Sequence, residues 1–252
     1  MQPNFHLAAF YSSLAASQTD LAIAPVVDPQ LTTNNNGMLL PENMRIGMAF
    51  ASGLGVTQAR FNVPSLRVVA QPRIHPVNKA LYPVDDAPVN RPFEQGARVL
   101  KTETFQAAMT SDATAGPNDS YVLAWLYNKP RQKVQGDITT IRATSTVTAV
   151  TGSWVLGAMT LEQDLPSGFY TVVGMDVWGA TAVAVRLRFP GGGYCPGVLC
   201  QQASGQFFLD TFRYNNCGAF GQFENSSIPQ IDVLGTSGAV TVQIFLDIIK
   251  TG

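Results

Sequence analysis

The chain has 252 residues and a formal net charge of −1, with 46% hydrophobic but only 13% charged residues. An ordinary soluble domain carries about 25% charged residues, so we expect other protein subunits to cover much of this surface. No stretch approaches the ~20 uninterrupted apolar residues of a membrane-spanning helix. The first basic residue is Arg45, so the chain lacks the basic arm that neutralises phosphates in many nucleic-acid-packaging proteins, and direct contact with nucleic acid is disfavoured.

The first residues lack the features of a secretory signal. Residues 1–10 contain no Lys or Arg, and Asn4 and His6 interrupt their apolar residues, so we expect no targeting segment. The apolar, uncharged stretch Phe5–Leu14 (FHLAAFYSSL) predicts a short helix that lies against a membrane or against the base of a neighbouring subunit. An edge strand within the chain's own fold is the alternative.

Strand-like runs recur along the rest of the chain, separated by clusters of Gly, Pro, Asn and Asp, and no long stretch has the period of a helix. The five prolines of residues 71–93 exclude a central strand there, so we expect a long extended loop that wraps a neighbour or lies on the surface. Residues 121–127 (YVLAWLY) are apolar on both faces, which is typical of a strand between two layers or at a subunit contact. Residues 181–189 and 239–249 alternate, which predicts one core face and one face toward solvent or a neighbour.

Short motifs recur in the same order at a spacing close to half the chain length. The matches are Leu40-Pro41 with Leu165-Pro166 (125 residues apart), Gly47-Met48 with Gly174-Met175 (127), Ala59-Arg60-Phe61 with Val185-Arg186-Leu187 and Pro64 with Pro190 (126 each), and residues 122–126 with 244–248 (122). Apolar residues alternate in the same phase around Arg60 and Arg186, so both arginines are expected on the face opposite the core. Chance similarity between β-strand sequences is the alternative.

The repeat predicts an all-β fold of two tandem jelly-roll sandwiches, a double jelly roll, related by internal duplication. Each half holds about seven or eight strand-like runs, which fits the eight strands of a jelly roll. The polar residues 128–137 (NKPRQKVQGD) have the charge and proline content of a linker. We therefore place the first jelly roll at residues 1–135 and the second at residues 136–252.

A tandem of two jelly rolls in one short chain resembles the double jelly-roll major capsid proteins of tailless icosahedral viruses, especially bacteriophages with an internal membrane. The resemblance covers the whole chain in architecture and rests on no diagnostic motif. It implies a homotrimer of pseudo-hexameric outline that tiles an icosahedral shell with neighbouring capsomers and other virion proteins, such as a vertex protein. It also implies contact with an internal membrane and no direct contact with nucleic acid. The chain is short for this family, which implies small loops and no elaborate outer tower.

No residue cluster points to catalysis, a metal ion or a cofactor. His6 and His75 are too few and too far apart for a metal-binding jelly roll of the cupin type, so we expect structural or surface histidines. Cys195, Cys200 and Cys217 lack the ligand number and paired spacing of a zinc site, and we expect reduced, partly buried thiols.

Three further motifs have a structural interpretation. Residues 190–193 (PGGG) lack the Lys-Ser/Thr of a phosphate loop and are expected to form a loop between strands. Asp85-Asp86 and residues 162–164 are expected to be solvated, with a calcium ion between subunits as the alternative. The sequons at Asn118 and Asn225 need a secretory route that the sequence does not predict.

Together with these patterns, the resemblance implies a structural capsid protein of the virion, made in the host cytoplasm, that forms trimers, self-assembles and is not an enzyme. The alternative is a receptor- or carbohydrate-binding jelly roll of a spike or minor virion protein. Exposed aromatic side chains clustered on one loop face would favour that alternative. A hydrolase is a third hypothesis, and it has no candidate group of residues.

Overall fold

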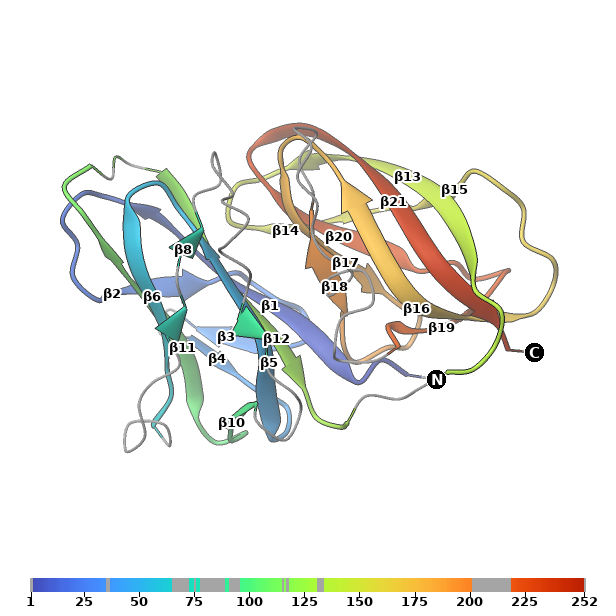
Figure 1. Cartoon of the computed structure of the whole chain (residues 1–252), viewed down its shortest axis with the longest axis horizontal. Helices are drawn as coiled ribbons and strands as arrows, with labels where there is room; N and C mark the ends of the chain where they lie inside the picture. Colours follow the sequence, from blue (N-terminus) through green and yellow to red (C-terminus); the bar gives the residue numbers. More distant parts are fainter. Residues whose placement is uncertain are drawn as a thin grey trace. The chain divides into compact units, whose positions relative to one another are not determined.

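The computed structural model describes residues 2–34, 37–64, 73–74, 76–77, 89–90, 96–114, 116, 118–130, 134–200 and 219–251, and its elements are β-strands (Figure 1). Contacts between residues divide the chain into two compact units. We call Ala8–Asn128 the amino-terminal roll, and Met1–Leu7 together with Lys129–Gly252 the carboxy-terminal roll. Within the described ranges, no helix is long and apolar enough to cross a membrane.

This division differs from the expected domains, 1–135 and 136–252, at two places. The boundary falls directly after Asn128, at the start of the expected linker, and residues 1–7 belong with the carboxy-terminal roll. The physical reason for the second difference is hydrogen bonding. The Leu7 N–H donates to the Cys195 carbonyl oxygen at 3.0 Å, and the Asn4 amide donates to the Pro130 carbonyl oxygen at 3.4 Å.

The carboxy-terminal roll is a sandwich of two antiparallel sheets. Its strands are β13 (Thr139–Ala149), β14 (Trp154–Gly157), β15 (Thr160–Leu161), β16 (Phe169–Trp178), β17 (Ala182–Arg188), β18 (Gly197–Leu199), β19 (Gly221–Glu224), β20 (Gln230–Gly235) and β21 (Gly238–Lys250). One sheet has the order β15-β13-β21-β16-β19, and the other has the order β14-β20-β17-β18. If β15 is set aside and the other strands are lettered B to I along the chain, the orders are B-I-D-G and C-H-E-F, which is the arrangement of a jelly roll.

The amino-terminal roll repeats this order. Its strands are β1 (Phe5–Leu14), β2 (Leu21–Pro25), β3 (Thr32–Asn34), β4 (Gly37–Leu39), β5 (Met44–Ser52), β6 (Val56–Asn62), β7 (Arg73–Ile74), β8 (Pro76–Val77), β9 (Val89–Asn90), β10 (Ala97–Val99), β11 (Thr104–Ser111) and β12 (Asn118–Tyr127). The series β1-β12-β5-β10 corresponds to B-I-D-G, and the series β2-β11-β6-β7 corresponds to C-H-E-F. The predicted fold class, an all-β chain of two jelly rolls, is therefore confirmed.

The predicted helix at Phe5–Leu14 is wrong, because this segment is strand β1. It lies between β12 and β2, so it is not an edge strand either. Its first six residues are all buried, and a strand that is buried on both faces shows a continuous apolar run in place of alternation. Such a run cannot be distinguished from a short buried helix by its period alone.

The strand patterns predicted elsewhere are largely confirmed. Every side chain of residues 121–127 is at most 2% exposed, in agreement with an apolar run buried on both faces. In β21, Val240, Val242 and Ile244 are buried while the intervening Thr241 and Gln243 are exposed. In β17, however, Arg186 is as buried as the core residue Leu187, so the expected solvent-facing side of that strand is covered.

The described residues of the proline-rich stretch 71–93 form three two-residue strands, β7, β8 and β9. Strands β8 and β9 pair with β5 at Ala51↔Pro76 and Met48↔Asn90, beyond the part of β5 that pairs with β10. Strands β8 and β9 therefore extend the edge of the sheet beside β5. They do not form a central strand, as expected from the prolines. His75, Asp85 and Asp86 lie outside the described residues.

The repeat is visible in the register of the strands. Strands β6 and β17 begin at Val56 and Ala182 and end at Asn62 and Arg188, which are 126 residues apart in both cases. Strand β5 has a β-bulge at Gly47, because Ile46 pairs with Leu126 while Met48 pairs with Trp125.

Strand β16 has its bulge at Val173, because Val172 pairs with Ile248 while Gly174 pairs with Asp247. Gly47 and Val173 are also 126 residues apart. The expected match of Gly47 with Gly174 is therefore displaced by one residue, since letter similarity does not show which residue bulges out of a ladder.

The bulge at Gly47 generates a prediction about stability. A Cβ atom at this position would lie 1.7 Å from Cε1 of Tyr127, so the ring has to move if a side chain is added. We expect Gly47→Ala to lower the free energy of unfolding by about 1–3 kcal/mol, the usual cost of overpacking. The penalty should shrink in a Tyr127→Leu background, where the ring is absent, as measured by urea denaturation. Equal penalties in both backgrounds would contradict this account.

Candidate functional site

The structure places only some of the residues that the sequence singled out for chemistry. His6 is buried in β1, and the side chains of Cys195 and Cys200 are buried as well. Cys217 lies outside the described residues. Among the residues that are described, no group of three or more His, Cys, Asp and Glu side chains is placed to hold a metal ion.

Two other motifs are found in loops. Residues 190–193 follow β17 as a tight turn, in which Gly191 has a φ of 67° and the Gly192 N–H donates to the Phe189 carbonyl oxygen at 3.0 Å, as expected for a loop between strands. Glu162 lies at the exposed end of β15, with a carboxylate oxygen 3.2 Å from Nε of Arg142.

The two arginines that the repeat aligned both form ion pairs, but in different surroundings. In β6, Arg60 Nε donates to Asp20 Oδ1 at 2.6 Å, and 27% and 44% of the two side chains are exposed. This hydrogen bond holds the pKa of Asp20 below its usual value. In β17, Arg186 Nε donates to Asp232 Oδ2 at 2.8 Å, and the exposed fractions are 0% and 1%. Equivalent positions thus carry a surface pair in one roll and a buried pair in the other.

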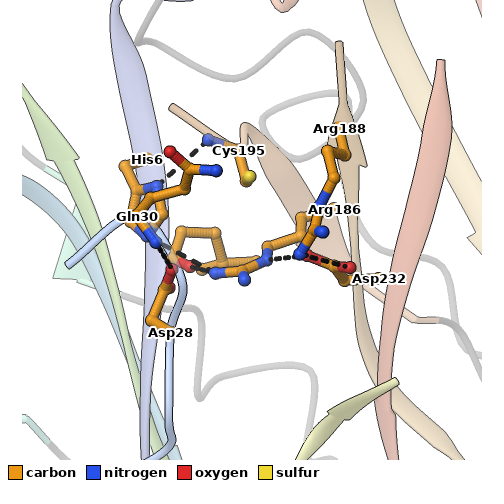
Figure 2. A network of polar contacts seen from close by, with 8 residues as sticks. His6, Asp28, Gln30, Arg186, Arg188, Cys195 and Asp232 are labelled. Atoms are coloured by element: carbon orange, nitrogen blue, oxygen red, sulfur yellow. Dashed lines mark hydrogen bonds and ion pairs between the residues drawn. The ribbon is translucent and has the colours of Figure 1, made fainter. Parts of the chain in front are cut away.

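The guanidinium group of Arg186 is the centre of a polar cluster in the carboxy-terminal roll (Figure 2). Its Nη1 donates to the Leu7 carbonyl oxygen at 3.2 Å, and its Cζ lies 4.2 Å from the centre of the Trp154 ring. Arg188 Nη2 also donates to Asp232, at 3.1 Å, so one carboxylate binds two guanidinium groups. The side chain of Arg188 is 27% exposed, which leaves part of its charge in contact with water.

The imidazole of His6 lies at the edge of this cluster. The Cys195 N–H donates to His6 Nδ1 at 3.0 Å, which makes Nδ1 an acceptor and assigns the proton of the neutral ring to Nε2. Nε2 lies 3.4 Å from Nη1 of Arg186, and because both atoms then carry protons, we interpret this as a packing contact.

The chemistry of this cluster is structural. Attraction between buried charges is largely offset by their desolvation, whereas removal of one partner leaves a buried charge without compensation. Asp232 lies directly across the ladder from Arg186, so the pair fixes the register of β17 against β20. The contact with Leu7 ties the same guanidinium to the first residues of the chain.

A second candidate surface is the outer face of β13, β21 and β16. Its cross-strand neighbours are Arg142 with Phe245 and Asp176, Thr144 with Gln243 and Trp178, and Thr146 with Thr241. The hydroxyls of Thr146 and Thr241 lie 3.0 Å apart, and Trp178 Nε1 donates to Asp176 Oδ2 at 3.4 Å. These side chains are exposed or half-buried, so this threonine-rich face is a polar, weakly charged surface that the described residues leave uncovered.

Sequence reasoning missed the buried cluster because none of its residues forms a local motif. Arg186 and Asp232 are 46 residues apart, and His6 is 180 residues from Arg186. The one signal in the sequence was an arginine in the middle of a strongly apolar strand, and its phase indicated a solvent-facing residue. Arg186 contacts residues 6 and 7 and the Trp154 ring, and the strand pattern shows none of these contacts.

The amino-terminal roll holds a separate polar contact. Tyr11 in β1 donates its hydroxyl to Asp119 Oδ1 at 2.9 Å, and its ring centre lies 5.2 Å from that of Tyr121. Burial, together with the hydrogen bond to Asp119 and its negative charge, raises the pKa of Tyr11 from 10.0 to about 12.

Comparison with known proteins finds likeness in structure alone. No protein-family model matches the chain, and no curated protein matches its sequence. The structure is similar to the "Crystal Structure of the STIV MCP", with 8% identity and a TM-score of 0.23 over 98% of this chain and 97% of that chain. It is also similar to the major capsid protein P2 from Bacteriophage PM2, with 11% identity and a TM-score of 0.24 over 98% of both chains. Superpositions this loose carry no argument, and the fold assignment rests on the strand order.

The two equivalent arginines allow an internally controlled test of burial. Arg186→Met leaves Asp232 buried beside only the half-exposed Arg188, so we expect a loss of about 3–5 kcal/mol in the free energy of unfolding. Arg60→Met removes a pair that is largely in water, and we expect a loss of no more than about 1 kcal/mol. Urea denaturation of both variants measures the difference, and equal losses would contradict the contrast between the two sites.

The raised pKa of Tyr11 predicts a loss of stability in alkali. Between pH 10 and about 12 the unfolded chain releases this proton while the folded chain retains it, so the free energy of unfolding falls as the pH rises. Below pH 10 the group contributes no pH dependence. We expect Tyr11→Phe to flatten the decline between pH 10 and 11.5, measured by urea denaturation against wild type. An unchanged slope would show that Tyr11 is not the group responsible.

Proposed function

We propose that this chain is a structural capsid protein that forms trimers and assembles into an icosahedral shell. The observation that carries the proposal is the presence of two jelly rolls with the same strand order in one chain of 252 residues. Three such chains supply six similar building blocks, so a threefold-symmetric trimer has a pseudo-hexameric outline. Closed cyclic symmetry is the usual arrangement of identical subunits.

The composition supports burial in an assembly. Stable obligate interfaces bury roughly 2,000–5,000 Å² and their centres are depleted in charged residues. A chain with 13% charged residues can cover such areas with few unpaired charges. In the carboxy-terminal roll, the threonine-rich face has few charged side chains, and Ile138, Val150 and Phe169 are exposed apolar side chains. Both could be covered by a neighbouring subunit without burying many unpaired charges.

The same proposal also specifies where the protein is located and which partners it contacts. The chain would be a component of the virion, made in the host cytoplasm, with neighbouring capsomers and a vertex protein as partners. An internal membrane would lie beneath the shell and separate the protein from the genome. Residues 1–44 contain no Lys or Arg, so this stretch would gain little from contact with phosphates, which supports the proposal.

A carbohydrate- or receptor-binding role is the competing hypothesis. Among the described residues, the exposed large hydrophobic side chains include one aromatic residue, Phe169, at the start of β16. A single aromatic residue does not form the clustered loop face that would favour saccharide binding. We therefore keep this role as an outcome of the test below.

Mass photometry of the purified chain tests the assembly. We expect a species of about 81 kDa, three times the 27.0 kDa of one chain, and hexagonal arrays or closed particles in electron micrographs at higher concentration. Because we expect mainly apolar contacts, the trimer should persist in 1 M salt, where ion pairs between exposed charges are screened. A monomer at all concentrations, or a monomer that binds a glycan array, would contradict the capsid role.

A further inference from the structure

We infer that residues 4–7 form a strap that completes the carboxy-terminal roll, so that the second jelly roll cannot close without the first residues of the chain. The inference concerns how the chain is stabilised, and it does not depend on the proposed capsid role. It rests on contacts inside the carboxy-terminal roll, to which residues 1–7 belong.

The strap is held by hydrogen bonds to residues that are far away in sequence. The Leu7 N–H donates a hydrogen bond to the Cys195 carbonyl oxygen at 3.0 Å. In return, the Cys195 N–H donates to Nδ1 of His6 at 3.0 Å. The Leu7 carbonyl oxygen accepts from Arg186 at 3.2 Å. His6, Arg186 and Cys195 are all at most 1% exposed, so water is a poor substitute for these partners. Without the strap, several buried polar groups would each lose a hydrogen bond.

An aromatic contact anchors the strap. The rings of Phe5 and Phe220 lie 5.2 Å apart at 72°, an edge-to-face pair, and both side chains are 0% exposed. The Phe220 N–H donates to the Val172 carbonyl oxygen at 2.8 Å, which fixes this residue against β16. Edge-to-face pairs contribute beyond their buried area, so truncation of Phe5 removes both area and ring contact. The strap therefore contacts the roll near β16 through Phe220, in β17 through Arg186, and just before β18 through Cys195.

Strand β1 offers a matched control for this idea. Phe10 is also 0% exposed and also forms an edge-to-face pair, with Phe105 at 5.3 Å and 78°. It lies five residues further along the same strand, but it belongs to the amino-terminal roll. Phe5→Ala and Phe10→Ala thus remove the same side chain from equally buried positions, and only the first of them lies in the strap.

Amide hydrogen exchange of the full chain, read by mass spectrometry under native conditions, tests the strap. In Phe5→Ala we expect exchange in residues 188–199 to accelerate by about tenfold or more, including the amide of Cys195, while β6 and β11 change little. In Phe10→Ala we expect faster exchange in β6 and β11 and little change in residues 188–199. Unchanged exchange around Cys195 in Phe5→Ala, or the same pattern in both variants, would overturn the inference.

A milder pair of variants covers the case in which the alanine variants do not fold. Phe5→Leu and Phe10→Leu retain most of the buried area and lose the ring pair. Iodoacetamide labelling, mapped to individual cysteines by mass spectrometry, should be faster at Cys195 in Phe5→Leu than in wild type and unchanged in Phe10→Leu. Equal labelling of Cys195 in all three proteins would show that the strap does not protect this region.

Discussion

Each roll is closed by pairing between its first strand and its last. In the carboxy-terminal roll, β13 pairs with β21 without interruption from Thr139↔Ile248 to Ala149↔Gly238. In the amino-terminal roll, β1 and β12 are neighbours in the sheet. Such pairing joins residues about a hundred positions apart, so the entropy of a long loop has to be overcome before the ladder forms. The bulged strands pair with these same last strands, β5 with β12 and β16 with β21, so their register depends on the closure.

The residue across the ladder from an arginine influences whether its charge can be buried. Arg186 lies on a central strand of its sheet, between β20 and β18, and Asp232 lies directly across from it. At the equivalent place in the amino-terminal roll, Ala108 lies across from Arg60, and the carboxylate comes from the exposed Asp20. The same strand position therefore carries a buried network in one roll and a solvated pair in the other. The difference is set by the residue opposite the arginine and by what covers it.

The sequence allowed the fold to be predicted where local alternation and repetition carry the information. The period of β21, the apolar run of β12 and the spacing of 126 between β6 and β17 were all readable in the sequence, and together they implied two equivalent sandwiches. The failures share a cause, which is that the deciding contact is distant in sequence. Strand β1 has no alternation because both of its faces are buried. The one-residue error at Gly47 arose because a bulge changes the register without changing the letters. Arg186, which is buried, contacts residues 6 and 7, and these are 180 and 179 positions away.

The place of the strap at the start of the chain has a consequence for synthesis. His6 is translated long before its partner Cys195, which lies 189 residues later in the sequence. At translation rates of about 5–20 residues per second, the segment waits for roughly 10–40 s before its binding surface exists. During that interval the apolar first residues are held by no native contact of the carboxy-terminal roll. The carboxy-terminal roll, which includes residues 4–7, can therefore be completed only after Cys195 has been translated.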